Sequence, residues 1–156
     1  MNRRESKLLL LALAFTMALV PAVLVKAKPL TGAMALYKPA SGPPSPVPGG
    51  VICWSGTISG DISGNMYFYN TGSKDVGWAH FFEEVWLITD ENGDTLLMGT
   101  DHGVVSKKNL KYRMNGVVTA AGQGFESLIG HRVHMSGIII KVDGIPVAAP
   151  GTFRVN

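Results

Sequence analysis

The sequence predicts an all-β fold: a single antiparallel β-barrel of about seven or eight strands, preceded by a signal peptide and a Pro/Gly-rich linker. Downstream of residue 50, short apolar and β-branched runs alternate with clusters of glycine, asparagine and aspartate that are typical of turns. Asn92-Gly93 lies between two such runs and predicts a tight hairpin. Consecutive hairpins favour an up-and-down barrel, which leaves no strand edge exposed to aggregation.

The first 27 residues have the pattern of a secretory signal peptide. A basic start is followed by an apolar run over residues 8–25, and Val25-Lys26-Ala27 fits the small-residue pattern of a cleavage site. A rival cleavage site follows Ala35. If the signal is retained, residues 8–25 would anchor the chain, because about 18 apolar residues just span a bilayer. Pro21 favours a cleaved signal, so we expect a protein that is exported, extracellular or at the cell surface.

The charge of the chain gives no support for a nucleic-acid partner. The whole sequence has a formal net charge of +3, with 14 Lys and Arg against 11 Asp and Glu. Residues 1–27 hold four of these cations and one anion, which leaves ten of each in the rest of the chain. The high isoelectric point therefore belongs to the signal peptide and not to the folded part.

Cys53 is the one cysteine, so the chain has no intrachain disulfide. It lies in the apolar run Val51-Ile52-Cys53-Trp54, where a buried structural thiol is the simplest interpretation. Stability must then come from burial of apolar side chains.

Residues 28–50 contain six prolines and four glycines, and we interpret them as a linker with part polyproline geometry. Such a segment can act as a spacer, lie along the barrel, or reach a neighbouring subunit. The barrel domain is then expected over residues 51–156.

The barrel strands follow in order from Val51. We expect strands over residues 51–58, 61–69, 79–88, 94–105, 110–121 and 131–142, then a short crossing over 145–150 and a closing strand over 151–156. The cluster Asn70-Thr71-Gly72-Ser73 predicts a turn after the second strand.

The stretch from Gly77 to Leu97 is the centre of the predicted barrel, and its first strand has two distinct faces. Side chains alternate across a strand, so every second residue shares a face. One face carries Phe81, Glu83, Val85 and Leu87. The other carries His80, Phe82, Glu84, Trp86 and Ile88. Neither face is cleanly polar, which predicts a strand that is covered on both sides for part of its length.

The order of these features resembles the allene-oxide-cyclase-like and dirigent-like barrels. The similarity rests on the glycine-spaced strands from Trp54 to Gly64, on the central hairpin, and on Gly122-Gln123-Gly124-Phe125 before the strand Arg132–Ile140. It covers roughly residues 51–156 and implies an eight-stranded barrel with an apolar lumen, often oligomeric. No catalytic residue of those families maps onto this chain, so the resemblance carries no activity.

Candidate site residues come from the central hairpin. Counting outward from Asn92-Gly93 pairs residues whose numbers sum to about 185, which places Glu83 or Glu84 opposite Asp101 or His102. A cross-strand Glu–His pair is either a structural pair or an acid–base pair if it faces the lumen, so Glu84 and His102 are the catalytic candidates. The ligand-binding candidates are His80, Phe82, Glu84, Trp86 and His102.

No metal site or cofactor is predicted. His80 and Glu84 are about 13 Å apart on a strand that rises ~3.3 Å per residue, so they do not ligate one metal ion. The chain has no G-x-S-x-G, H-E-x-x-H, P-loop or C-x-x-C pattern.

Three functions fit these patterns. The favoured one is a non-enzymatic exported barrel that binds a small apolar ligand or serves in the cell envelope. The second is an isomerase or cyclase that uses the lumen with acid–base groups. The third is a structural subunit that assembles by strand addition through the 28–50 arm, and a homo-oligomer fits the third and the resemblance alike. Contact with a membrane is expected only through residues 8–25.

Overall fold

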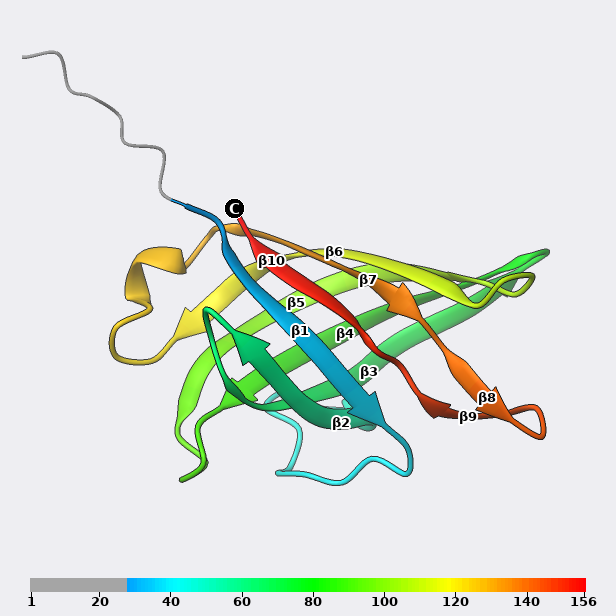
Figure 1. The fold of residues 1–156 in the computed structure, drawn as a ribbon, viewed down its shortest axis with the longest axis horizontal. Coiled ribbons are helices and arrows are strands. Elements are labelled where there is room, and N and C mark those ends of the chain that lie inside the picture. The colour runs from blue at the N-terminus through cyan, green and yellow to red at the C-terminus, as the bar shows by residue number, and fades with distance from the viewer. Residues whose placement is uncertain (1–27) are drawn as a thin grey trace, which may run out of the picture.

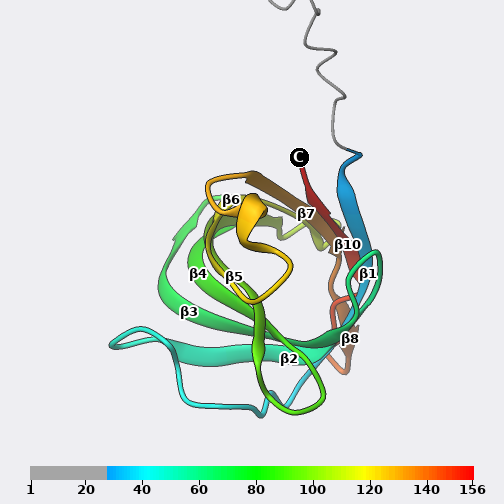
Figure 2. The same cartoon turned by 90° about the vertical axis from the view of Figure 1, so that its left-hand side faces the viewer.

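The computed structural model describes residues 28–156, which form a closed antiparallel β-barrel (Figures 1 and 2). The predicted all-β barrel is confirmed. The predicted signal peptide, residues 1–27, lies outside the described residues. Within residues 28–156 no helix has the length and apolar character needed to cross a membrane.

Eight strands form the barrel wall, and two more form an outer hairpin. The wall strands are β1 (Leu30–Tyr37), β2 (Val51–Gly60), β3 (Gly64–Val76), β4 (Ala79–Thr89), β5 (Thr95–Ser106), β6 (Lys111–Ala121), β7 (Arg132–Ile138) and β10 (Gly151–Val155). The outer hairpin is β8 (Ile140–Val142) with β9 (Ile145–Ala148), and a single 3₁₀ turn, η1 (Glu126–Leu128), lies between β6 and β7. Each wall strand pairs with its neighbour in sequence except at β10, which pairs with both β7 and β1.

The segment predicted as a linker supplies a wall strand. Leu30–Tyr37 forms β1, which pairs with β2 on one side and with β10 on the other and so closes the barrel. The linker prediction was wrong for these residues because it weighed the composition of 28–50 as a whole. Within β1 itself no residue is proline or charged, and Gly32 is the one glycine. This strand is fully paired, so it is not a free arm for strand addition to a second barrel.

Residues 38–50 lie along the outside of the barrel, as one of the sequence interpretations allowed. The hydroxyl of Tyr69 donates to the carbonyl of Pro43 at 2.9 Å, and the backbone amide of Ser41 donates to the hydroxyl of Ser55 at 3.0 Å. The segment buries Tyr69 on the outer face of β3.

The central hairpin has the predicted turn and register. Asp90 accepts hydrogen bonds from the backbone amides of Asn92 and Asp94 at 2.9 and 2.8 Å, and Gly93 has a φ of 90° that favours glycine. The β4–β5 register pairs residues whose numbers sum to 185 up to Ile88.

Two strand boundaries differ from the prediction. The cluster predicted as a turn after residue 69 is a β-bulge at Thr71, and β3 continues through it to Val76. The single strand predicted over 131–142 is divided, because β7 ends at Ile138 and β8 leaves the wall to pair with β9. Turn-forming residues at a bulge resemble those of a turn in sequence.

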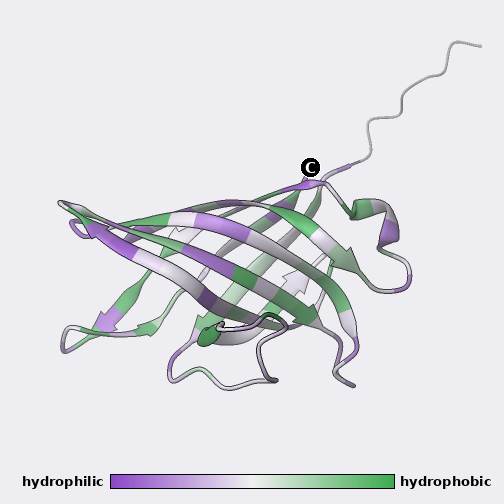
Figure 3. Cartoon of the chain, turned by 180° about the vertical axis from the view of Figure 1, so that it is seen from behind, coloured by the Kyte–Doolittle hydropathy of each residue, from purple (hydrophilic) through white to green (hydrophobic). Residues whose placement is uncertain are grey.

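The core fills one end of the lumen. Hydrophobic and hydrophilic residues are interspersed along the wall strands (Figure 3). Because neighbouring residues of a strand point to opposite faces, every second side chain faces the lumen. Trp86, fully buried, packs edge to face on Phe153 with ring centroids 5.4 Å apart. Met66, Ile88, Leu97 and Met135 surround this pair, and all are completely buried.

The close approach of β1 to β2 gives the first prediction. A Cβ on Gly56 would lie 2.9 Å from the backbone carbon Cα of Leu36 and still closer to the carbonyl of Ala35. We expect Gly56→Ala to lower the free energy of unfolding by about 1–3 kcal/mol, the usual cost of overpacking. The measurement is chemical denaturation of both proteins.

Gly72→Ala is the matched control, because a Cβ there meets only a carboxylate oxygen of Glu83 at 3.6 Å. Equal denaturation midpoints for Gly56→Ala and the unmodified protein would show that β1 does not pack on β2.

Candidate binding pocket in the barrel lumen

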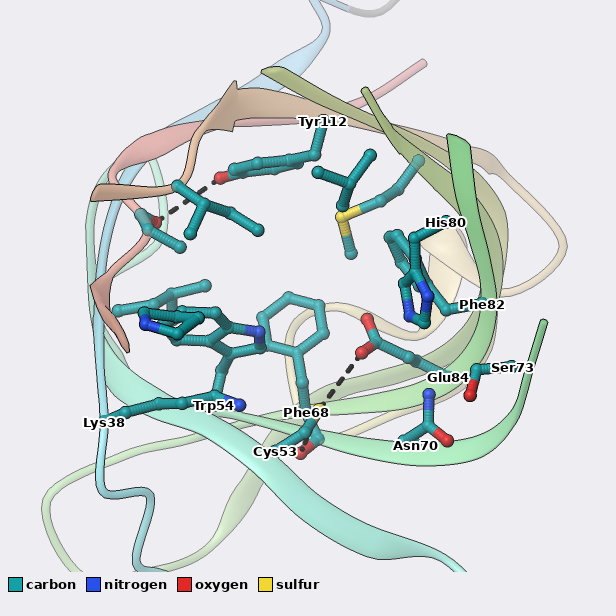
Figure 4. A pocket seen from close by; sticks show the side chains of 16 residues that line it. Lys38, Cys53, Trp54, Phe68, Asn70, Ser73, His80, Phe82, Glu84 and Tyr112 are labelled. Carbon is teal, nitrogen blue, oxygen red and sulfur yellow. Dashed lines mark hydrogen bonds between the residues drawn. The ribbon is translucent and has the colours of Figure 1, made fainter. Parts of the chain in front are cut away.

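The end of the lumen opposite the core holds a cavity of about 340 Å³ (Figure 4). Its lining residues Ser73, His80 and Val105 lie near the β3–β4 and β5–β6 turns, so we call that end of the barrel the mouth end. The end with the β4–β5 turn is the closed end. The apolar walls of the cavity include Leu36, Trp54, Phe68, Phe82, Val105 and Met114. Its polar groups include Lys38, Cys53, Asn70, Ser73, His80 and Glu84.

Strand β4 places four of the five ligand-binding candidates inside the barrel. His80, Phe82 and Glu84 line the cavity, and Trp86 lies deeper on the same inward face, where it belongs to the core. Burial increases along this face from the half-buried His80 to the fully buried Trp86. The sequence did not determine which face of β4 points inward. The structure shows that it is the face with His80, Phe82, Glu84 and Trp86.

His102 does not join them. The register pairs it with Glu83, and it pairs Glu84 with Asp101. Because neighbouring residues of a strand point to opposite faces, His102 is exposed on the outer wall while Glu84 is buried in the lumen. The predicted Glu84–His102 acid–base pair is therefore absent, and the residue beside Glu84 inside the barrel is Asp101.

Two β-bulges lie next to Glu84 and shape its surroundings. The extra residue in β2 is Cys53, and the extra residue in β3 is Thr71, one position beyond Asn70, which pairs with Glu84. The first bulge turns both Cys53 and Trp54 toward the cavity. Sequence reasoning missed Cys53 and Asn70 as pocket residues, because period-two counting cannot locate an inserted residue.

The Glu84 carboxyl is a deeply buried ionisable group that lines the cavity, with 6% of its surface exposed. Burial raises the pKa of Glu84 to about 7, against a smaller downward effect of the thiol of Cys53 and the charge of Lys38. The thiol donates to Glu84 Oε1 at 3.0 Å. Near neutral pH the group therefore exchanges between an acid that donates and a carboxylate that accepts.

Asp101 is a second buried carboxyl on the neighbouring strand. Both of its carboxyl oxygens are buried without a hydrogen-bond partner among the described residues. Burial, and then the nearby Glu84, raise the pKa of Asp101 well above its ordinary value. An unpaired carboxylate in this position would be costly, so the aspartic acid is held in its neutral form.

Cys53 is a structural thiol, in agreement with the sequence interpretation, although its side chain also borders the cavity. Burial and the neighbouring Glu84 raise the pKa of the thiol, so little thiolate forms at neutral pH. The thiol is thus a hydrogen-bond donor to Glu84 rather than a nucleophile.

Charged groups hold the rim of the mouth in place. Asp75 accepts from His80 Nδ1 at 2.9 Å and lies 3.2 Å from Lys107 Nζ, and these contacts, the histidine first, lower the pKa of Asp75. On the opposite wall the Lys38 ammonium lies 4.7 Å from the ring centroid of Trp54. These groups form a polar entrance to a cavity whose walls are mainly apolar.

Among residues 28–156 no three His, Cys, Asp or Glu side chains converge to hold a metal ion. No family model, curated protein or solved structure matches this chain. The resemblance to allene-oxide-cyclase-like barrels stays a prediction, and the function is argued from the geometry of the lumen.

The raised pKa of Glu84 gives the second prediction. Between its unfolded pKa of 4.5 and its folded pKa of about 7, the folded protein binds more protons, so stability falls as the pH rises. At ~1.4 kcal/mol per pKa unit, the change approaches about 3 kcal/mol. We expect Glu84→Gln to gain stability relative to the unmodified protein between about pH 4 and about pH 8 by up to that amount.

Glu83→Gln is the matched control, because Glu83 is the next residue on the same strand and is exposed. Denaturation at several pH values measures both variants. A stability difference for Glu84→Gln that is constant with pH would contradict the shifted pKa.

Proposed function

We propose that this protein is an exported, non-enzymatic binding module that holds one small, mainly apolar molecule in the barrel lumen. The observation that carries the proposal is the 340 Å³ cavity with apolar walls and one deeply buried carboxyl, Glu84. Ligand sites typically combine apolar walls with a few polar groups that fix orientation. The cavity is near the lower end of the usual range of about 300–1,000 Å³, which favours a ligand smaller than a typical drug molecule.

Glu84 is the group best placed to anchor the ligand. One carboxyl oxygen is engaged by Cys53, and the other points toward the empty centre of the cavity (Figure 4). The hydroxyl of Tyr112, by contrast, lies within hydrogen-bond distance of the carbonyls of Ala149 and Pro150, and His80 is bonded to Asp75. A ligand with a single hydroxyl, amine or amide group is therefore matched to Glu84, with its apolar remainder against Phe68 and Phe82.

The position of β1 supports export with cleavage after Ala27. Cleavage there leaves the whole of β1, which begins at Leu30. Cleavage at the rival site after Ala35 would remove most of β1 and with it the pairing to β2 and β10. A closed barrel after export therefore favours the earlier site.

A second candidate function is proton transfer on a small substrate in the same cavity. The observation that favours it is the pKa of Glu84, raised to about 7, since an acid–base catalyst works best when its pKa is near the working pH. His102 has no part in it because it lies on the outer wall. We rank binding first because Asn70, His80 and Tyr112 are hydrogen-bonded to the protein, which leaves no second acid–base group beside Glu84 in the cavity that is free to move a proton.

The third prediction tests binding with N-phenyl-1-naphthylamine, a small apolar fluorophore with one N–H group. We expect its fluorescence to rise on binding to the protein and the rise to be lost in Val105→Phe, which places a ring in the cavity. Val104→Phe is the matched control, because Val104 is the preceding residue of β5 and faces the outer wall. Equal binding by both variants would place the probe elsewhere.

The fourth prediction concerns the anchor. Loss of one hydrogen bond costs about 0.5–1.5 kcal/mol, so we expect Glu84→Leu to weaken probe affinity by roughly three- to tenfold and Glu83→Leu to leave it unchanged. Fluorescence titration measures both. An unchanged affinity in Glu84→Leu would show that Glu84 does not anchor the probe, and the cavity would remain as the binding site.

Proton transfer is tested separately with a small β,γ-unsaturated cyclic ketone, whose conjugated isomer absorbs in the ultraviolet. Turnover that is lost in Glu84→Gln and kept in Glu83→Gln would favour the second candidate. Binding of the ketone without turnover would favour the first.

A further inference from the structure

The two ends of the barrel differ in charge. Exposed cations gather at the mouth end, where they are Lys74, Lys107, Lys108, Lys111, Arg113 and Lys141. Only two exposed carboxylates of the described residues lie among them, Asp75 and Asp143, and Asp75 is already paired with Lys107. At the closed end the turns carry the acidic residues Asp61, Asp90, Glu91, Asp94 and Glu126, and three cations, Lys28, Arg132 and Arg154, lie near them. By formal count residues 28–156 hold ten Lys and Arg against ten Asp and Glu, so the mouth end is positive because of this separation.

Exposed apolar side chains gather at the same end. Trp78 and Ile145 are 70% and 65% exposed, and they lie at the β3–β4 turn and at the tip of the β8–β9 hairpin. Val76 and Val142, each more than half exposed, stand beside them. Of the large apolar residues that are exposed, only Ile129 lies at the closed end. Clustered exposure of this kind marks an interaction site.

The two apolar tips project together along the barrel axis. In Figure 1 the β3–β4 turn and the β8–β9 hairpin both extend to the right-hand end of the molecule, opposite the C-terminus. The cavity is lined by Ser73 and His80 from the strands that form one tip, and by Ile139 and Pro146 from the segment that forms the other. The mouth of the cavity therefore opens between the tips.

We propose that the mouth end docks on the surface of an anionic lipid bilayer, with Trp78 and Ile145 inserted at the headgroup level. Tryptophan is favoured at that depth because its ring is apolar with one polar N–H. Lysines beside an inserted apolar group are attracted by anionic lipids. Two separate projecting tips suit a fluid surface better than a protein partner, which would have to match both tips and the gap between them.

This docking differs from the membrane contact expected from the sequence, which was confined to residues 8–25. It does not rest on ligand binding in the lumen, because the tips and the lysines lie outside the cavity. If both proposals hold, the cavity opens toward the bilayer, and an apolar ligand passes between membrane and lumen without crossing water.

The test uses the chain that begins at Lys28, which contains every strand of the barrel. We expect it to sediment with vesicles of phosphatidylcholine and phosphatidylglycerol and to do so far less with phosphatidylcholine alone. The fluorescence of Trp78 should shift to shorter wavelength on binding, and Trp78→Phe should lose the shift.

The variants separate the two contributions. We expect Trp78→Ser/Ile145→Ser to reduce vesicle binding, and Lys108→Glu/Lys141→Glu to reduce it at least roughly tenfold, since each cation near an anionic surface contributes to binding. Matched controls at the closed half are Ile129→Ser and Arg132→Glu, which should bind as the unmodified protein does. All of these side chains are exposed, and a far-ultraviolet circular dichroism spectrum equal to that of the unmodified protein shows that each variant is folded.

Three results would overturn the proposal. One is the absence of vesicle binding, and another is equal binding to neutral and anionic vesicles. The third is a dimer that forms without vesicles and is lost in Trp78→Ser/Ile145→Ser, since the tips would then be an interface between copies of this chain. Each of these leaves the proposal for the lumen standing.

Discussion

Closure of the barrel by β1 is the constraint on which the rest of the structure depends. β1 pairs with β2 along one side and with β10 along the other, so the wall has no unpaired edge around the lumen. Only a closed wall makes the inward face of each strand an interior. That interior is what removes Glu84 and Asp101 from water and what keeps the cavity apart from solvent on all sides but one. Gly56 is part of this constraint, because no side chain fits between the two strands there.

Strand β4 runs from the packed core of the lumen to the cavity at its other end. Toward the closed end β4 contributes Trp86 and Ile88 to the buried core, and toward the mouth it contributes His80 and Phe82 to a cavity. Glu84 lies at the boundary between these two regions. A buried carboxyl weakens a core, so its presence at the floor of the cavity favours a role in binding over a role in stability. The bulge at Cys53 completes this boundary by bringing a hydrogen-bond donor to the carboxyl.

The features that the sequence predicted correctly are those set by neighbouring residues, such as a turn and the register of the two strands that it joins. Asn92-Gly93 set the turn, and counting from it gave the β4–β5 register that puts Glu84 opposite Asp101. The alternation of β4 correctly grouped His80, Phe82, Glu84 and Trp86, but the choice of inward face, and so the exclusion of His102, depends on the packing of all strands together. β1 was missed because its partners, β2 and β10, are supplied by distant parts of the chain, and proline-rich neighbours dominated the composition of its surroundings. The alternation of side chains does not reveal where a bulge inserts an extra residue. For that reason the sequence did not predict Cys53 and Asn70 as pocket residues.

The pairing of β1 with β10 joins the first strand of the barrel to the last. Leu30 lies opposite Val155, so the ring cannot be completed until nearly the whole chain is available. Contacts between residues so far apart in sequence form late and slowly, because the intervening chain must first be ordered. For a chain that is threaded through a translocation channel from its N-terminus, this order of events delays folding until the last residues emerge. If the chain is exported as we propose, this topology allows the barrel to close only after release.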